Sequence, residues 1–182
     1  PTAKPAVLHL STHASMDDRN PMGGKIYLAD GDITVKEIYT FPYATQLAVL
    51  SGCETGTGQL QSGEGLISLA RAFMQSGTPS VVTSLWQVDD KATGDIMINF
   101  YNNLLTKQQK PRALQKAKLD FMATSESEIL HHPYYWAAFI QIGNTEQVAV
   151  GAGSKYWWWA LGVAGLLLFF VGRYFLFSGK GR

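Results

Sequence analysis

Two residues suited to acyl transfer, a cysteine and a histidine, each follow a short apolar run in this sequence. Cys53 is the only cysteine and stands in a glycine-rich turn after the apolar run 47–50, and His13 follows the apolar run 6–10. The thiolate is the reactive form of cysteine, and a nearby imidazole can generate it. A free cysteine is commonly a small buried hydrophobe, but a turn between glycines is a poor place to bury one. The pair therefore predicts a nucleophile and its base, although four histidines make the pairing alone a weak signal.

The residues around Cys53 favour this chemistry. Gly52 and Gly56 permit a sharp turn with exposed amides, and a helix predicted from position 63 directs its positive end toward the thiol. The amides of Cys53 and Ala14 are candidate oxyanion donors, each worth roughly 2.7–4 kcal/mol in comparable sites. Glu54 has three interpretations: it orients the loop, it interacts with the end of the helix, or it is a solvated loop carboxylate.

The pattern of apolar residues predicts an α/β fold that brings these groups together. Continuously apolar strands are expected near 6–10, 47–50, 80–88 and 135–142, with amphipathic helices after 63, 90 and 111. A hairpin over 25–32 and a helix over 34–39, capped by Thr34, are expected between the first two strands. Strands of this kind form a mostly parallel sheet with helices on both faces, and ligands bind beyond its carboxyl edge. His13 and Cys53 are thus expected at one edge.

Polar residues after the third strand are candidates for a substrate pocket, and they are Ser84, Trp86, Asp89 and Asp90. An inward-pointing aspartate would select a basic residue before the cleaved bond. A helix cap is an equally good reading of either aspartate, and a core position is the commoner fate of Trp86. His9 shares a strand face with residue 13 and is predicted to be a packed or hydrogen-bonded core residue.

Five blocks carry a resemblance to CHAT domains, which belong to the caspase and separase clan of cysteine peptidases. They keep the family's order and spacing over residues 6–143, and they are Leu8-His9-Leu10-Ser11-Thr12-His13-Ala14, Leu50-Ser51-Gly52-Cys53-Glu54-Thr55-Gly56, Gly63-Glu64-Gly65, Ser84-Leu85-Trp86-Gln87-Val88-Asp89-Asp90 and His132-Pro133-Tyr134-Tyr135-Trp136-Ala137-Ala138-Phe139. The resemblance implies a caspase-like fold with its first strands missing from this chain. It places catalysis on His13 and Cys53, with peptide cleavage through an acyl-enzyme, and it implies an N-terminal TPR-type region. That mechanism requires no metal or organic cofactor.

The C-terminal part predicts a membrane anchor. Residues 156–172 carry no charge, and aromatic residues stand at both ends of the span 156–177. We expect four regions: a CHAT domain over 1–143, a linker over 144–155, a transmembrane helix over 156–177 and a basic tail over 178–182. Positive charges after the span favour a cytoplasmic C-terminus and a domain facing a bacterial periplasm, whereas a tail-anchored protein would have the reverse arrangement.

The composition limits the other function classes. A net charge of +1 with no long basic run gives no electrostatic footprint for nucleic acid. One cysteine excludes an intrachain disulfide, and the adjacent His131 and His132 diverge too much to form a metal pair. Two hypotheses remain: a membrane-tethered endopeptidase that cuts a protein partner, and a caspase-like scaffold that binds a partner without cutting it.

Overall fold

The fold is built on a four-stranded sheet with the strand order β1-β5-β6-β7. The computed structural model describes residues 6–15, 20–52 and 64–149. Strands β1 (Val7–Leu10), β5 (Leu47–Leu50) and β6 (Ser80–Ser84) run parallel, and β7 (Phe139–Gly143) is antiparallel to β6. The mostly parallel sheet predicted from the continuous apolar runs is confirmed.

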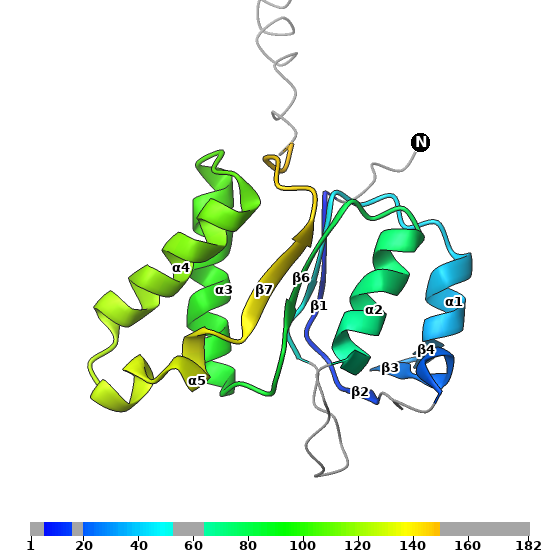
Figure 1. Cartoon of the computed structure of the whole chain (residues 1–182), viewed down its shortest axis with the longest axis horizontal. Coiled ribbons are helices and arrows are strands. Elements are labelled where there is room, and N and C mark those ends of the chain that lie inside the picture. The colour runs from blue at the N-terminus through cyan, green and yellow to red at the C-terminus, as the bar shows by residue number, and fades with distance from the viewer. Residues whose placement is uncertain (1–5, 16–19, 53–63, 150–182) are drawn as a thin grey trace, which may run out of the picture. The chain divides into compact units, whose positions relative to one another are not determined.

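Helices cover both faces of this sheet, as Figure 1 shows. Alternate strand residues enter two separate cores because successive side chains point to opposite faces. Ala48 and Leu50 pack with the helices α1 (Val35–Thr40) and α2 (Glu64–Gln75). Leu47 and Val49 pack with α3 (Asp90–Leu105) and α4 (Lys110–Thr124). Burial on both sides explains why β5 is apolar throughout.

A second, three-stranded sheet extends from the end of β1. It consists of β2 (Ala14–Ser15), β3 (Lys25–Leu28) and β4 (Gly31–Thr34), all antiparallel, with the short helix η1 (Pro21–Gly23) between β2 and β3. Thr34 then starts α1 through a capping box with Glu37, as the sequence predicts for its cap. The predicted hairpin and helix between the first two large strands are therefore confirmed.

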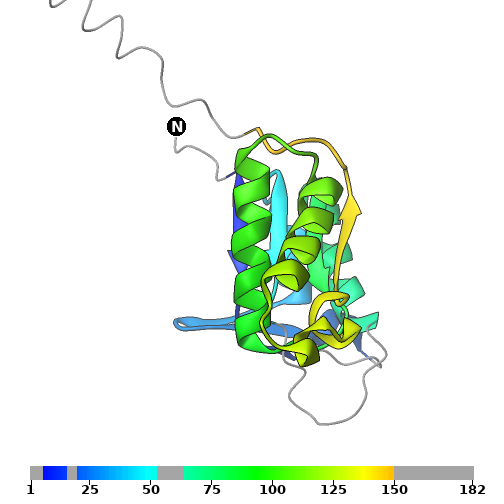
Figure 2. The same ribbon diagram turned by 90° about the vertical axis from the view of Figure 1, so that its left-hand side faces the viewer.

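The two helices on the other face begin where their sequence signals predict. Asp89 caps α3, and Pro111 stands in the first turn of α4. The two helices lie side by side across the face that Figure 2 turns toward the viewer. Their contact buries Ile96, Phe100 and Phe121. This packing holds the first turn of α3 beside the carboxyl ends of the strands.

The predicted strand over 135–142 is wrong in its first half. The chain forms the short helices η2 (Glu128–His131) and α5 (Pro133–Trp136) before β7 begins at Phe139. His132 starts α5 because its Nδ1 accepts a hydrogen bond from the Tyr134 amide, and Pro133 supplies a helical first residue. Aromatic residues suit a strand and a buried helical turn equally, so the pattern did not separate the two.

The segment 144–149, predicted as the start of the linker, packs against the sheet domain. Val148 is 4% exposed, and the Ala149 amide and carbonyl both bond to the Gln46 side chain. Buried Lys110 also donates to the Glu146 carbonyl at 2.6 Å. The segment up to Ala149 therefore belongs to the same compact unit as the sheet. The glycines and polar residues of this segment predict a linker. In the structure, burial of Val148 and the hydrogen bonds of Glu146 and Ala149 hold it against the domain.

The predicted anchor 156–177 and basic tail 178–182 lie outside the described residues, as does the remainder of the predicted linker. Within residues 6–15, 20–52 and 64–149, the helices are all too short or too polar to cross a bilayer.

Candidate active site

The candidate site lies where the carboxyl ends of β1 and β5 meet. Leu10 pairs with Leu50, and the Ser51 amide donates to the Leu10 carbonyl at 3.1 Å, so the two chains stay together just beyond their strands. A Cβ on Gly52 would lie 2.4 Å from the Thr12 nitrogen and 2.7 Å from the Ser11 carbonyl carbon. Only glycine fits this approach, which brings the segment before Cys53 against the segment before His13.

Two neighbouring cavities open at this edge, and they share His13, Ser51, Gly52 and Asp90. The larger has a volume of about 440 Å³ and lies between the end of β1 and the first turns of α3. The smaller has a volume of about 110 Å³ and extends toward the end of β6. The four shared residues come from three segments far apart in the sequence: the chain after β1, the chain after β5 and the first turn of α3. This is the arrangement expected beyond the carboxyl edge of a parallel sheet.

His13 stands between the two sheets with an exposed side chain. Its carbonyl accepts a hydrogen bond from the Tyr27 amide at 3.0 Å, which fixes the backbone at the start of β2. His13 and Tyr27 thus face each other as a hydrogen-bonded pair. The next pair along the two strands is Ala14 and Ile26. In an antiparallel ladder a residue of such a next pair directs its N–H away from its partner strand. The Ala14 amide is thus turned away from β3, as an oxyanion donor would have to be.

Cys53, Glu54 and Gly56 lie outside the described residues. The described chain reaches Gly52, the residue directly before the thiol, and Gly52 lines both cavities together with His13. The catalytic pair and the Cys53 amide therefore remain sequence predictions. Of the residues involved, the structure places His13, and it places Gly52, which precedes Cys53, in the same cavity linings.

The four predicted pocket residues separate into different roles. Ser84 ends β6, is buried, and lines the smaller cavity, and Asp90 lines both cavities. Asp89 instead accepts from the Ala92 amide at 2.9 Å as the cap of α3. Trp86 is 36% exposed, so the core reading does not apply to it.

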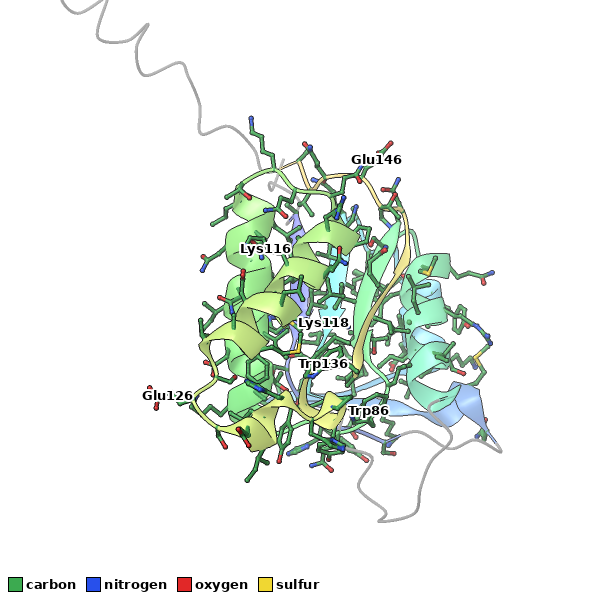
Figure 3. The ribbon with its side chains drawn as sticks, turned by 60° about the vertical axis from the view of Figure 1, so that its left-hand side comes forward. Trp86, Lys116, Lys118, Glu126, Trp136 and Glu146 are labelled. Carbon is green, nitrogen blue, oxygen red and sulfur yellow. The ribbon has the colours of Figure 1, made fainter. Side chains whose placement is uncertain are left out.

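Trp86 is held in place by a hydrogen bond to α5, the short helix before β7. Its indole N–H donates to the Tyr134 carbonyl at 2.9 Å, and that of Trp136 donates to the His131 carbonyl at 3.0 Å. Both indoles are labelled in Figure 3, where they lie at the end of the domain that carries α5. They tie η2 and α5 to the loop after β6, and so support the wall of the site rather than its interior.

His9 is hydrogen-bonded on both ring nitrogens. Its Nε2 lies 2.7 Å from Ser51 Oγ, and its Nδ1 lies 2.9 Å from the hydroxyl of Tyr101 in α3. The ring reaches solvent, but packing against Tyr101 desolvates it and lowers the pKa of His9 below its ordinary value. Burial also raises the pKa of Tyr101 to about 12. The prediction of a hydrogen-bonded histidine is confirmed, and its position is at a cavity rather than in the core.

Several lining residues were not predicted from the sequence. Gln87 and Val88 line the smaller cavity, and Thr93, Gly94 and Met97 line the larger one. Thr93, Gly94 and Met97 lie on successive turns of α3, so their spacing predicts that they share one face of the helix. The spacing does not predict that this face lies beside the strand ends. Ser51 had a usable signal, since it immediately follows a buried strand and precedes the predicted nucleophile turn.

Comparison with known proteins decides the family. The family model described as "CHAT domain" matches residues 1–144. The chain belongs to the CHAT domain family. The match includes the whole four-stranded sheet, both cavities and the glycine-rich sequence after β5, and the CHAT family is associated with cysteine peptidase-like proteins.

Two curated relatives of this CHAT domain carry the same name in two organisms. Tetratricopeptide repeat protein 28 of Mus musculus and that of Homo sapiens are each 29% identical to it over 112 residues. The alignment covers 62% of this chain and 4% of each relative, so the chain matches a small part of much longer proteins.

Proposed function

We propose that this CHAT domain is a cysteine endopeptidase in which Cys53 is the nucleophile and His13 is the base. The observation that carries the proposal is the contact between the ends of β1 and β5. It brings His13 into the same cavities as Ser51 and Gly52, which directly precede Cys53. The family supports the same reaction class. His13 would take the thiol proton and later return it to the leaving amine of the acyl-enzyme.

The smaller cavity is the proposed pocket for the substrate residue before the cleaved bond. Its described lining has one acidic side chain, that of Asp90, beside the neutral Ser84 and Gln87. Asp89 is used as a helix cap, so Asp90 is the aspartate available to meet a cation. A lysine or arginine at this substrate position would pair with the Asp90 carboxylate.

The experiment compares the full-length protein with its Cys53→Ala variant by labelling new protein N-termini. Cleavage after basic residues in the wild type, absent in the variant, supports the proposal. Identical cleavage profiles under activating conditions would count against it. Asp90→Asn is the matched specificity variant, since it keeps the shape and removes the charge.

A scaffold that binds without cutting is the second candidate. It is favoured by the modest size of the smaller cavity, about 110 Å³. A peptidyl acyloxymethyl ketone separates the two, because it alkylates an activated cysteine. Modification of Cys53 that is lost in His13→Ala protein would rule out an inert scaffold.

We also propose that residues 156–177 tether the domain to a membrane, with the domain on the extracytoplasmic side and the C-terminus in the cytoplasm. The uncharged span and the positive residues after it support this. Partner recognition would fall to a TPR-type region, and the relatives' name is consistent with such a setting. Extraction at alkaline pH tests the anchor, and protease accessibility in intact cells and spheroplasts tests its orientation.

A further inference from the structure

Three hydrogen-bonded side chains form a chain from the larger cavity into the domain. Ser51 and His9 line the cavity, and Tyr101 lies behind them on α3. The Ser51 Oγ to His9 Nε2 distance is 2.7 Å, and the His9 Nδ1 to Tyr101 Oη distance is 2.9 Å. A hydroxyl within hydrogen-bond reach of an imidazole that a third group orients is the arrangement of an activated nucleophile.

The protonation states allow this arrangement to function at neutral pH. Burial holds His9 in its neutral form by lowering its pKa, and keeps Tyr101 protonated. A neutral imidazole carries one N–H. When Nδ1–H donates to Tyr101, Nε2 is an acceptor and receives the Ser51 hydroxyl proton. In that tautomer, Ser51 is paired with a base and the base is held by Tyr101.

We propose that Ser51 is a second nucleophile of this domain, which accepts acyl groups from small esters in the larger cavity. A volume of about 440 Å³ is of the size that small-molecule sites have. Among the described residues, His9 is hydrogen-bonded to Ser51 and not to Ser11, which lines the same cavity. The base therefore selects one of two nearby serines. Cys53 takes no part in this reaction, so the inference is independent of the peptidase proposal.

The reaction balances without a cofactor. Ser51 Oγ adds to the ester carbonyl carbon while its proton moves to His9 Nε2. The carbon–oxygen bond to the alcohol then breaks, and the alcohol leaves with the proton from Nε2. A water molecule attacks the acyl-serine in the same way, with His9 again taking and returning the proton, and this step releases the carboxylic acid and restores Ser51.

The rate should depend on pH through the base. Among the described residues, the other titratable groups lining the cavity are His13 and Asp90, and Tyr101 is the titratable group that α3 packs against His9. Protonated His9 cannot accept the serine proton. The reaction should therefore slow at pH values below 6.5, the ordinary pKa of histidine, because burial lowers the pKa of His9. His9→Ala should remove this pH dependence.

The test uses the full-length protein with Cys53→Ala, which removes the thiol, and a fluorophosphonate probe whose fluoride leaves as the serine–phosphorus bond forms. We expect an adduct on the peptide that contains Ser51, identified by mass spectrometry. It should be absent in Ser51→Ala and retained in Ser15→Ala, a serine of β2 outside both linings. His9→Ala should slow labelling about 100-fold or more, as loss of a general base does, and added imidazole should restore it.

Tyr101→Phe is the conservative companion, because it keeps the ring packed on His9 and removes only the hydroxyl. It should slow labelling about tenfold, the low end of a positioning effect. A Cys53→Ala protein with an intact melting transition and no Ser51 adduct would overturn the proposal. So would Ser51 labelling at an unchanged rate in His9→Ala and in His9→Gln, since either result would make the hydrogen bonds structural only.

Discussion

Substitution of Gly52 by alanine should destabilise the domain, because the added methyl group would collide with backbone atoms, which cannot move aside as a side chain can. The Cβ of Gly52→Ala would lie 2.4 Å from the Thr12 nitrogen, 2.7 Å from the Ser11 carbonyl carbon and 2.9 Å from the Ser11 Cα. An ordinary contact begins near 3.4 Å, so the ends of β1 and β5 must separate by about 1 Å. The φ angle of Gly52 is not in the left-handed region, so the cost is steric rather than conformational.

The expected loss of stability follows from that displacement. Overpacking a well-fitted interior costs about 1–3 kcal/mol, which in a domain of this size lowers the melting temperature by about 2–12 °C. The displacement also falls between the segment before His13 and Gly52, the residue directly before Cys53. A misplacement of about 1 Å between reacting groups can cost about 100-fold in rate, so peptide cleavage should fall by more than the stability loss explains.

Thermal unfolding and cleavage rates, measured well below the melting temperature, check both parts. Gly94→Ala is the control for the stability measurement alone, because a Cβ there meets nothing within 4 Å and the residue lies within α3 but lines the larger cavity. It should gain up to about 1 kcal/mol from helix propensity. If Gly52→Ala melts with the wild type, the close approach of the two strand ends does not exist as described, and the reasoning about the site fails.

Three further outcomes can be measured on the same protein. Asp90→Asn should lower cleavage after lysine and arginine relative to neutral residues by about tenfold, as a competition assay with matched peptides would show, with an unchanged ratio speaking against Asp90. Lys110→Met should destabilise the domain by about 1–3 kcal/mol, because the Glu146 carbonyl loses its buried donor, and denaturant unfolding measures this. His9 has a lowered pKa, so the unfolded chain binds its proton more readily and stability should fall as the pH drops below about 6.5. That loss should be smaller in His9→Gln, and parallel pH profiles for the two proteins would contradict it.

The sequence by itself determined the elements that lie in the core. Residues 47–50 form a strand buried on both faces, and a strand with no polar face leaves a continuous apolar run. The strand 80–84 is buried as well, although Ser80, Thr83 and Ser84 are polar. Caps such as Thr34 and Asp89 fixed helix starts because their hydrogen bonds are made within a few residues. The motifs around His13 and Cys53 were sufficient to identify the family.

Only the tertiary structure decided which polar side chains share a cavity. Asp89 and Asp90 are adjacent in the sequence, and the packing of α3 gives one to a helix cap and the other to the two cavities. His9, Ser51 and Tyr101 are far apart in the chain, and their hydrogen bonds exist because β1, β5 and α3 meet at one edge. Hydrogen bonds between residues a few positions apart can be predicted from the sequence. These contacts instead depend on the order of the strands in the sheet and on which face of α3 packs against it.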